Sequence, residues 1–300
     1  MKLRKILQKT QRELKNALYS EWRGFGYDVV KGDGYIYKDG TFPVLLVAHM
    51  DTVHKKPPRE IIVKDGIMSS PTGIGGDDRC GIYMIEQIIK RYDCSVLLTE
   101  DEEIGCVGAD KFAKSELASE LKDRFCYIIE LDRRGKNDAV FYDLDNIYFE
   151  EFITEKHWKT NFGTCSDISV IAPVLNCAAV NLSCGYYNEH TLVETINLKE
   201  MKTNIDEVCK LLCRTDIETV WEWKEIEWTT YRTNYGAIDF YIEFIDESGE
   251  PNFDCVLADS EYEAIGIFMA DHPTLTYNHI SDIDDYTRTW ERGNKYGYLK

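Results

Sequence analysis

The first two thirds of the chain contain short apolar runs that end abruptly in acidic or histidine residues. Runs that are apolar at successive positions, rather than at alternate ones, are typical of strands buried on both faces. We therefore predict buried strands at residues 44–49, 95–99, 127–132 and 178–184. Two shorter strands are expected at 27–30 and 35–37, and a hairpin at 60–69 that turns at Asp65-Gly66.

Segments with apolar residues at helical spacing lie between these strands. Residues 1–18 predict one surface helix, and further helices are expected after the glycines at 73–76, at 107–120 and at 197–213. Strands that alternate with helices predict a three-layer α/β/α domain with a mostly parallel central sheet. Sites in such sheets lie at the carboxyl ends of the strands, which is where this chain has its acids and histidines.

The pattern changes near residue 215. The following segment is rich in aromatic residues, and its alternating stretch AIDFYIEFI (237–245) precedes a second strand, a helix at 261–270 and a last strand. We expect residues 1–215 to form the α/β domain and residues 216–300 a small α+β module of strand-strand-helix-strand order. The sequence assigns no role to this module.

Composition and charge exclude several kinds of partner. The chain carries 53 acidic and 35 basic residues, and a net charge of −18 repels nucleic-acid phosphates. No run approaches the roughly 20 apolar residues of a membrane span, and the basic start lacks the apolar stretch of a signal peptide. We expect a cytoplasmic protein with no nucleic-acid or membrane partner, whose ten cysteines are reduced and mostly buried.

Five residues at predicted strand ends or helix starts form a candidate metal centre: His49, Asp77, Glu103, Asp132 and His190. If the sheet is parallel, these residues meet at one edge, where their carboxylates would repel one another unless divalent cations offset the charge. Imidazole combined with carboxylates favours zinc, with manganese or cobalt as alternatives, over calcium or magnesium.

Each residue of this set also has a plainer interpretation. A histidine at a strand end, such as His49, can belong to the core, and Asp77 and Asp78 can cap a helix. The acidic run at 100–103 can be a solvated loop. The metal centre is favoured because all five residues occur together, in one order, where polar residues interrupt apolar runs.

Five motifs in this order resemble the co-catalytic zinc peptidases, a family that includes tripeptidase T, aminoacylase, glutamate carboxypeptidase and compact bacterial aminopeptidases. The resemblance covers residues 1–213, and its motifs are AHMDTVH (48–54), GIGGDDRCGI (73–82), LLTEDEEIGCVGA (97–109), ELDRRG (130–135) and GYYNEHT (185–191). It implies a zinc-peptidase (phosphorylase/hydrolase-like) fold with two divalent metal ions. Asp77 would bridge the ions, His49 and Asp132 would complete one site, and Glu103 and His190 the other.

The resemblance also implies roles for residues that do not bind metal. Glu102 would be the general base that takes a proton from the attacking water, and Asp51 would hold His49 in the required tautomer. Asp78 and Asp167 would support the ligands from behind, or, for Asp167, border the substrate pocket. The peptide bond between Asp77 and Asp78 is often cis in this family, and we expect it to be cis here.

Larger members of the family insert a lid domain between the last two motifs, but residues 133–189 are too few to hold one. We expect a metallopeptidase for short peptides, most simply an aminopeptidase, with a small peptide or amide substrate and possible self-association into a homo-oligomer. Because the lid usually selects the substrate, two alternatives stay open. One is a metal-dependent amidohydrolase or deacylase of a non-peptide metabolite, and the other is an inactive binding scaffold.

Overall fold

The computed structural model of the chain describes residues 1–142, 144–163, 165–224, 238–245, 251–258, 260–272 and 277–282. The chain divides into two compact units, Met1–Ile226 and Glu227–Lys300. Trp221 belongs to the first unit, where its backbone bonds to the backbones of Cys126 and Ala178 at 2.8 and 2.7 Å. The first unit therefore extends past residue 215. That residues 1–215 form the catalytic domain and residues 216–300 a separate module stays a prediction.

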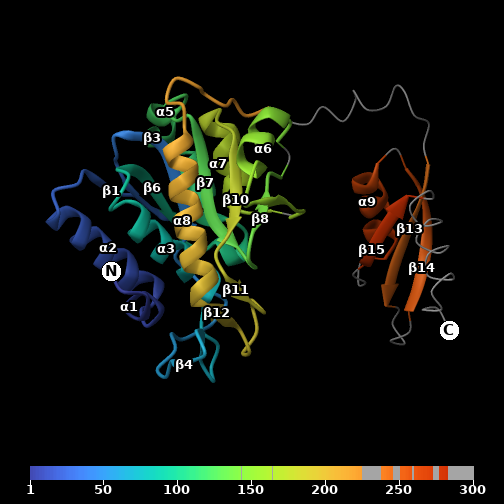
Figure 1. Ribbon diagram of the computed structural model, residues 1–300, viewed down its shortest axis with the longest axis horizontal. Coiled ribbons are helices and arrows are strands. Elements are labelled where there is room, and N and C mark those ends of the chain that lie inside the picture. The colour runs from blue at the N-terminus through green and yellow to red at the C-terminus, as the bar shows by residue number, and fades with distance from the viewer. Residues whose placement is uncertain are drawn as a thin grey trace. The chain divides into compact units, whose positions relative to one another are not determined.

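An eight-stranded sheet of order β1-β2-β6-β3-β7-β10-β8-β9 forms the centre of the first unit (Figure 1). Its four middle strands run parallel, as predicted: β6 (Cys94–Thr99), β3 (Phe42–His49), β7 (Tyr127–Arg133) and β10 (Ala179–Ser183). On one side the sheet continues with antiparallel β2 (Tyr35–Lys38) and β1 (Val29–Lys31). On the other side, β8 (Asp138–Val140) is antiparallel to β10 and pairs in parallel with β9 (Lys159–Thr160).

Helices cover both faces of this sheet, which confirms the predicted three layers. Along β3, Val44, Leu46 and Ala48 enter one apolar core, whereas Leu45 and Val47 enter a second core on the opposite face. The first core is closed by α1 (Leu3–Leu7), α2 (Gln11–Gly24), α3 (Gly76–Ile88), α6 (Ile147–Thr154) and α8 (Leu198–Arg214). The second core is closed by α4 (Val107–Ala113), α5 (Glu116–Leu121) and α7 (Asp167–Leu175).

Two helices that the apolar spacing predicts as continuous are each divided, so these two predictions are wrong in length. The expected helix at 1–18 is α1 followed by α2, because Thr10 and Glu13 form a capping box that starts a new helix. The expected helix at 107–120 is α4 followed by α5, because Ser115 caps the start of α5: its side chain accepts from the Ala118 N–H. Hydroxyl groups at these positions satisfy helix-start amides and outweigh the apolar periodicity.

A second, four-stranded antiparallel sheet lies beside the first, at the bottom of Figure 1. The predicted hairpin supplies β4 (Ile62–Lys64) and β5 (Ile67–Ser69), with Asp65 and Gly66 at positive φ in its turn. The other two strands are β11 (Tyr186–Tyr187) and β12 (Thr195–Asn197), which the sequence did not predict. This sheet holds both ends of the loop that carries His190.

The second unit has the predicted strand-strand-helix-strand order. Strands β13 (Ile238–Ile245), β14 (Pro251–Ala258) and β15 (Tyr277–Asp282) form an antiparallel sheet of order β14-β13-β15, and α9 (Glu261–Asp271) packs on it. Phe240, Ile242, Phe244 and Phe268 are among its core residues.

The cysteines whose side chains are described are all free thiols, and only Cys165 and Cys213 among them are exposed. This agrees with the expectation of reduced, mostly buried cysteines. Among the described residues, no helix is both long enough and apolar enough to span a bilayer.

Candidate metal centre

The predicted site residues come from separate parts of the chain and meet at the carboxyl edge of the parallel strands. His49 ends β3, and Asp132 lies near the end of β7. Glu102 and Glu103 form a short 3-10 turn directly after β6, and Asp77 is in the first turn of α3. His190 belongs to the loop between β11 and β12.

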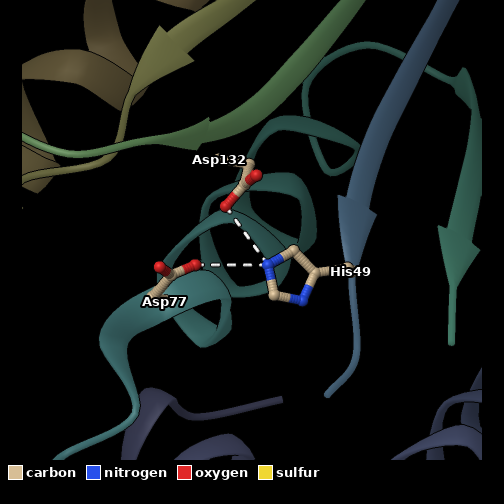
Figure 2. A group of neighbouring side chains, drawn as sticks. All are labelled: His49, Asp77 and Asp132. Atoms are coloured by element: carbon tan, nitrogen blue, oxygen red, sulfur yellow. Dashed lines mark hydrogen bonds and ion pairs between the residues drawn. The ribbon is translucent and has the colours of Figure 1, made fainter. Parts of the chain in front are cut away.

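His49 lies at the centre of a first cluster (Figure 2). Its Nε2 is 3.2 Å from Asp77 Oδ1 and 3.3 Å from Asp132 Oδ1, and its side chain is only 1% exposed. One ligand atom from each of the three residues lies within 4.8 Å of the others. This spacing allows the three residues to hold one metal ion.

A second cluster shares Asp77 with the first. His190 Nε2 lies 3.1 Å from Asp77 Oδ2 and 2.9 Å from Glu103 Oε2, so each oxygen of Asp77 faces a different histidine. These three residues also offer ligand atoms within 4.8 Å of one another. The other oxygen of Glu103, Oε1, is buried without a hydrogen-bond partner among the described residues, as is expected of an atom that binds a cation.

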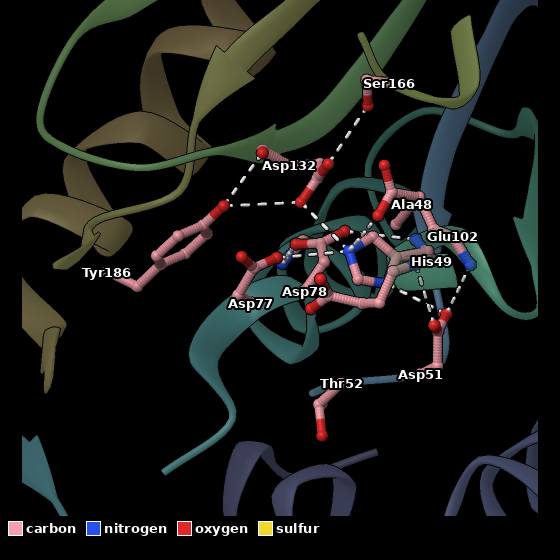
Figure 3. A network of polar contacts seen from close by, with 12 residues as sticks. Ala48, His49, Asp51, Thr52, Asp77, Asp78, Glu102, Asp132, Ser166 and Tyr186 are labelled. Carbon is pink, nitrogen blue, oxygen red and sulfur yellow. Dashed lines mark hydrogen bonds and ion pairs between the residues drawn. The ribbon is translucent and has the colours of Figure 1, made fainter. Parts of the chain in front are cut away.

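Asp51 connects His49 to the turn that carries Glu102 and Glu103 (Figure 3). Its Oδ1 is 3.2 Å from His49 Nδ1, and its two oxygens accept from the backbone N–H groups of Glu102 and Glu103 at 3.0 and 3.1 Å. Asp51 thus occupies Nδ1 and leaves Nε2 of His49 facing the clusters. The Oε2 atom of Glu102 is 3.9 Å from this Nε2 and faces the same space.

Asp78 lies behind the ligands and is fully buried. Its carboxylate accepts from the backbone N–H groups of His49 at 3.3 Å and Gly81 at 2.9 Å, so it joins the end of β3 to the start of α3. The Asp77-Asp78 peptide bond is cis, as expected.

Polar residues from three other elements hold Asp132. Its backbone N–H donates to Asn181 Oδ1 at 3.0 Å, and the Ser166 hydroxyl donates to its Oδ2 at 3.2 Å. The Tyr186 hydroxyl donates to its carbonyl oxygen at 2.9 Å. Sequence reasoning did not single out these three residues, because serine, asparagine and tyrosine in short apolar runs carry no distinctive signal.

Glu194 is the most important residue that sequence reasoning missed. It is 1% exposed and accepts three hydrogen bonds: from the backbone N–H groups of Gly75 and Asp77 at 2.8 and 2.9 Å, and from His54 Nε2 at 3.1 Å. The ring of His54 in turn fills the space beside Gly73, where an added Cβ would lie 2.2 Å from it. An acid between Val193 and Thr195, just before a strand, was a usable signal of the kind that identified the other acids.

Asp167 and Glu130 are buried acids behind the two clusters. Asp167 begins α7, accepts from the Thr99 hydroxyl, and leaves its Oδ1 without a partner among the described residues. Glu130 on β7, which the sequence did not single out, is 1% exposed and has one such oxygen, Oε2. Burial raises the pKa of Asp167 to about 7, and burial together with Asp132 raises the pKa of Glu130.

When only the protein's own atoms are considered, the site has an excess of negative charge. Burial raises the pKa of Asp132, and burial together with Asp77 raises the pKa of Glu103 to about 7. Burial alone would lower the pKa of His49, but Asp132, Asp51 and Asp77 outweigh it and raise the pKa. Cations among these carboxylates would reverse the shifts of the acids and keep them ionised, so the donor set fits divalent metal ions.

Comparison of the whole structure with solved structures identifies similar folds. An aminopeptidase PepT from Bacillus cereus superposes with a TM-score of 0.57 at 16% sequence identity, over 70% of this chain and 96% of that one. This chain therefore shares its fold with that aminopeptidase. A tripeptidase from Staphylococcus aureus gives 0.55 at 15% identity (70% and 95% covered), and an aminopeptidase from Desulfurococcus kamchatkensis gives 0.55 at 13% identity (75% and 97%).

The resemblance inferred from the motifs is therefore confirmed at the level of the fold. No protein-family model and no curated protein sequence matches the chain. The fold is compact, as expected, since the described residues between Asp132 and His190 form β8 to β11 and their helices rather than a separate lid.

Proposed function

We propose that the first unit is a metal-dependent peptidase that removes the N-terminal residue of short peptides. The observation that carries the proposal is the pair of clusters that share Asp77, with Glu102 facing the same space. Their arrangement on an aminopeptidase fold supports hydrolysis of an amide bond.

Each of the two clusters would hold one metal ion. Asp77 would bridge two divalent ions, with His49 and Asp132 at one and Glu103 and His190 at the other. Zinc is the favoured metal for this imidazole-carboxylate set, and manganese and cobalt are alternatives. Bound there, such ions would lower the pKa of a water molecule and polarise the carbonyl of the substrate.

The protein's own residues would orient the ligands and move the proton. Asp51 fixes His49 through Nδ1, and the Asp51 bonds to the turn amides also fix the backbone of Glu102. Glu102 would accept a proton from the attacking water at its carboxylate and deliver it to the amine that leaves. Asp78 would hold β3 against α3 behind the ligands. Asp167, at the start of α7, would hold the end of β6 through its bond from the Thr99 hydroxyl.

Turnover by a Glu102→Gln variant tests the proposal. Glutamine keeps the shape of the side chain but cannot take the proton, so we expect kcat to fall by at least about a hundredfold while metal content is unchanged. The assay uses dipeptides, tripeptides, aminoacyl anilides and N-acyl amino acids with zinc, manganese or cobalt. Full activity in the variant excludes Glu102 as the base, and hydrolysis of N-acyl substrates alone would favour the deacylase alternative.

Metal content separates an enzyme from a binding scaffold. We expect up to two metal ions per chain after purification without chelator, and a chain that retains less than about one would favour the scaffold.

Self-association is also part of the proposal, and a similar structure, PhTET1-12s, is a dodecamer. Light scattering during size-exclusion chromatography measures the oligomeric state directly.

A further inference from the structure

A cavity of about 210 Å³ adjoins the metal centre, between the loop that follows His49 and the first two helices. Asp51, Thr52 and Gly75 line it on the side of the centre, and Thr10 and Gln11 line it at the start of α2. Figure 3 shows Asp51 and Thr52 on the opposite side of His49 from Asp132. The site described above uses none of this space.

Four basic side chains are among the residues that line the cavity: Arg79, Lys9, Lys55 and Lys56. Arg79 is 4% exposed; its Nη1 donates to the Ile6 carbonyl at 3.2 Å, but its Nε is buried with no hydrogen-bond partner among the described residues. Lys9, Lys55 and Lys56 also line the cavity, and no ion pair joins any of the three to another described residue. A buried guanidinium donor without an acceptor costs free energy, and the carboxylates of Asp51 and Asp78 offset part of the charge of Arg79.

The acids in the same wall are already occupied. Asp51 is bonded to His49 and to the amides of the Glu102-Glu103 turn, and Asp101 Oδ1 accepts from Gln11 Nε2 at 2.9 Å. Two carboxylates, Asp51 and Asp101, therefore share the cavity wall with four basic side chains, and the basic side chains are in excess in a chain whose net charge is −18. A guanidinium with lysines around it is suited to a carboxylate, which guanidinium binds by paired hydrogen bonds.

We propose that this cavity binds a carboxylate of the substrate, either the C-terminal carboxylate of a short peptide or an acidic side chain beyond the cleaved bond. The inference deepens the proposed function and rests on it. Because the cavity is small and is joined to the centre through Asp51, which bonds to His49, its occupant would be the part of the peptide a residue or two past the bond that is cut. The cavity would then supply the substrate selection that a lid supplies in larger peptidases.

Matched peptides test the two sources of the carboxylate. Trialanine is compared with trialaninamide, and Ala-Ala-Glu-amide with Ala-Ala-Gln-amide, by kcat/KM and by calorimetric binding to the Glu102→Gln variant. We expect at least about a tenfold preference for the charged member of one pair, which is the effect of one charge-assisted hydrogen bond. The first pair reports a terminal carboxylate, and the second reports an acidic side chain.

Variants locate the preference in the cavity. Lys55→Gln with Lys56→Gln, and separately Arg79→Lys, should reduce the preference toward one. Arg79→Lys keeps a positive charge but removes the planar fork, and circular dichroism checks that this variant folds. Lys5→Gln with Lys64→Gln changes the charge equally at exposed lysines outside the cavity, and the preference should stay.

The outcomes separate the cavity from the proposed function. If peptides are hydrolysed but neither pair shows a preference, or if the preference survives the Lys55/Lys56 and Arg79 changes, the cavity proposal is wrong and the peptidase proposal stands. If no peptide is hydrolysed but binding shows a preference that those changes remove, the peptidase proposal fails and the carboxylate site stands.

Discussion

Among single residues, Glu194 has the largest expected influence on the metal centre without being a ligand. Both of its oxygens are used by the loop that carries Asp77, and Oε2 accepts from both Gly75 and His54. In Glu194→Gln, an amide nitrogen replaces one acceptor, so at least one of the three donors loses its partner. We expect about 10- to 100-fold weaker metal affinity and a free energy of unfolding lower by about 1–3 kcal/mol.

Competition with a metal-sensitive dye measures the affinity, and urea unfolding measures the stability. Glu207→Gln is the control, since Glu207 lies on α8, is not part of the centre, and pairs with Lys210. Unchanged metal affinity in Glu194→Gln would mean that the position of Asp77 does not depend on this residue.

A second residue-scale prediction concerns Lys38, whose ammonium is fully buried at the end of β2. It donates to Asp93 Oδ1 at 2.8 Å and to two backbone carbonyls, and it lies 4.1 Å from the centre of the Tyr27 ring. Burial would raise the pKa of Asp93, but the bonds from Lys38 and Thr41 outweigh it and hold the pKa below its ordinary value. The ionised form of Asp93 therefore stabilises the folded state.

The sign of the pH dependence follows from this lowered pKa. The contribution of Asp93 is complete above its unfolded pKa of about 3.9 and is lost as the pH falls through the lower folded value. Asp93→Asn should thus be less stable than wild type at pH 7, with a gap that narrows below about pH 4. Urea unfolding from pH 7 to pH 3.5 measures the gap. Asp33→Asn, at a carboxylate that is 87% exposed, should show little difference at any pH.

Among the elements, helix α3 determines how closely Asp77 and Asp78 approach the sheet. A Cβ on Gly81 would lie 1.7 Å from the Leu131 carbonyl on β7 and 2.5 Å from the Asp78 carboxylate. Only glycine allows this contact, so Gly81→Ala must displace α3 from β7. We expect a loss of about 1–3 kcal/mol or more in stability, together with weaker metal binding.

Gly24→Ala is the matched control for this change. Gly24 ends α2 at a normal helical position, and nothing lies within 4 Å of an added Cβ. Its replacement should be neutral or slightly stabilising. If Gly81→Ala were equally mild by thermal unfolding, the close approach of α3 to β7 would not matter for the fold.

Elements that a continuous apolar pattern defines were predictable, and elements defined by local bonding were not. The parallel strands, and the candidate ligands near their ends, could be predicted because polar residues interrupt buried runs. Helices α6 and α7 were missed because they are short and because Pro173 interrupts the pattern of α7. Strands β11 and β12 are only two and three residues long, and β12 pairs with β5, which is distant in the chain. A pattern of two or three residues is too short to predict such pairing.

The residues of the candidate site likewise fall into two groups, those that the sequence could predict and those that it could not. The residues that carry metal-type chemistry stand out in a sequence because acids and histidines at strand ends are conspicuous. The residues that hold them, such as Asn181, Ser166 and Glu194, act through single hydrogen bonds that only the assembled fold defines. The cavity beside Arg79 was equally invisible, because it forms between the loop after β3 and the start of α2.

At the scale of the whole molecule, the first unit concentrates buried acids where three parallel strands end. Asp77, Asp78, Glu130 and Asp167 are at most 8% exposed, and the Asp132 side chain is 9% exposed. Among the described residues beside them, Arg79 and, when protonated, His49 are buried groups of opposite charge. A fold that buries this much like charge is expected to depend on cations for part of its stability.

Removal of metal tests this dependence for the molecule as a whole. A ligand that binds only the folded state stabilises it by about 4 kcal/mol when its free concentration is a thousandfold above Kd. For a unit of this size, that corresponds to a rise in Tm of roughly 8–16 °C. We therefore expect dialysis against a chelator to lower the Tm by about this amount, and one or two equivalents of zinc to restore it.

Asp77→Asn provides the control that ties the effect to the proposed centre. Because Asp77 belongs to both clusters, its loss should abolish most of the difference between metal-loaded and metal-free protein. The Lys5→Gln, Lys64→Gln variant should keep the full difference. Trp22 and Trp158 are buried in the core of the first unit, so its unfolding contributes to the change in tryptophan fluorescence. A Tm that does not change with chelator in the wild type would show that the buried acids are held without cations, and would remove the physical basis for a metal centre here.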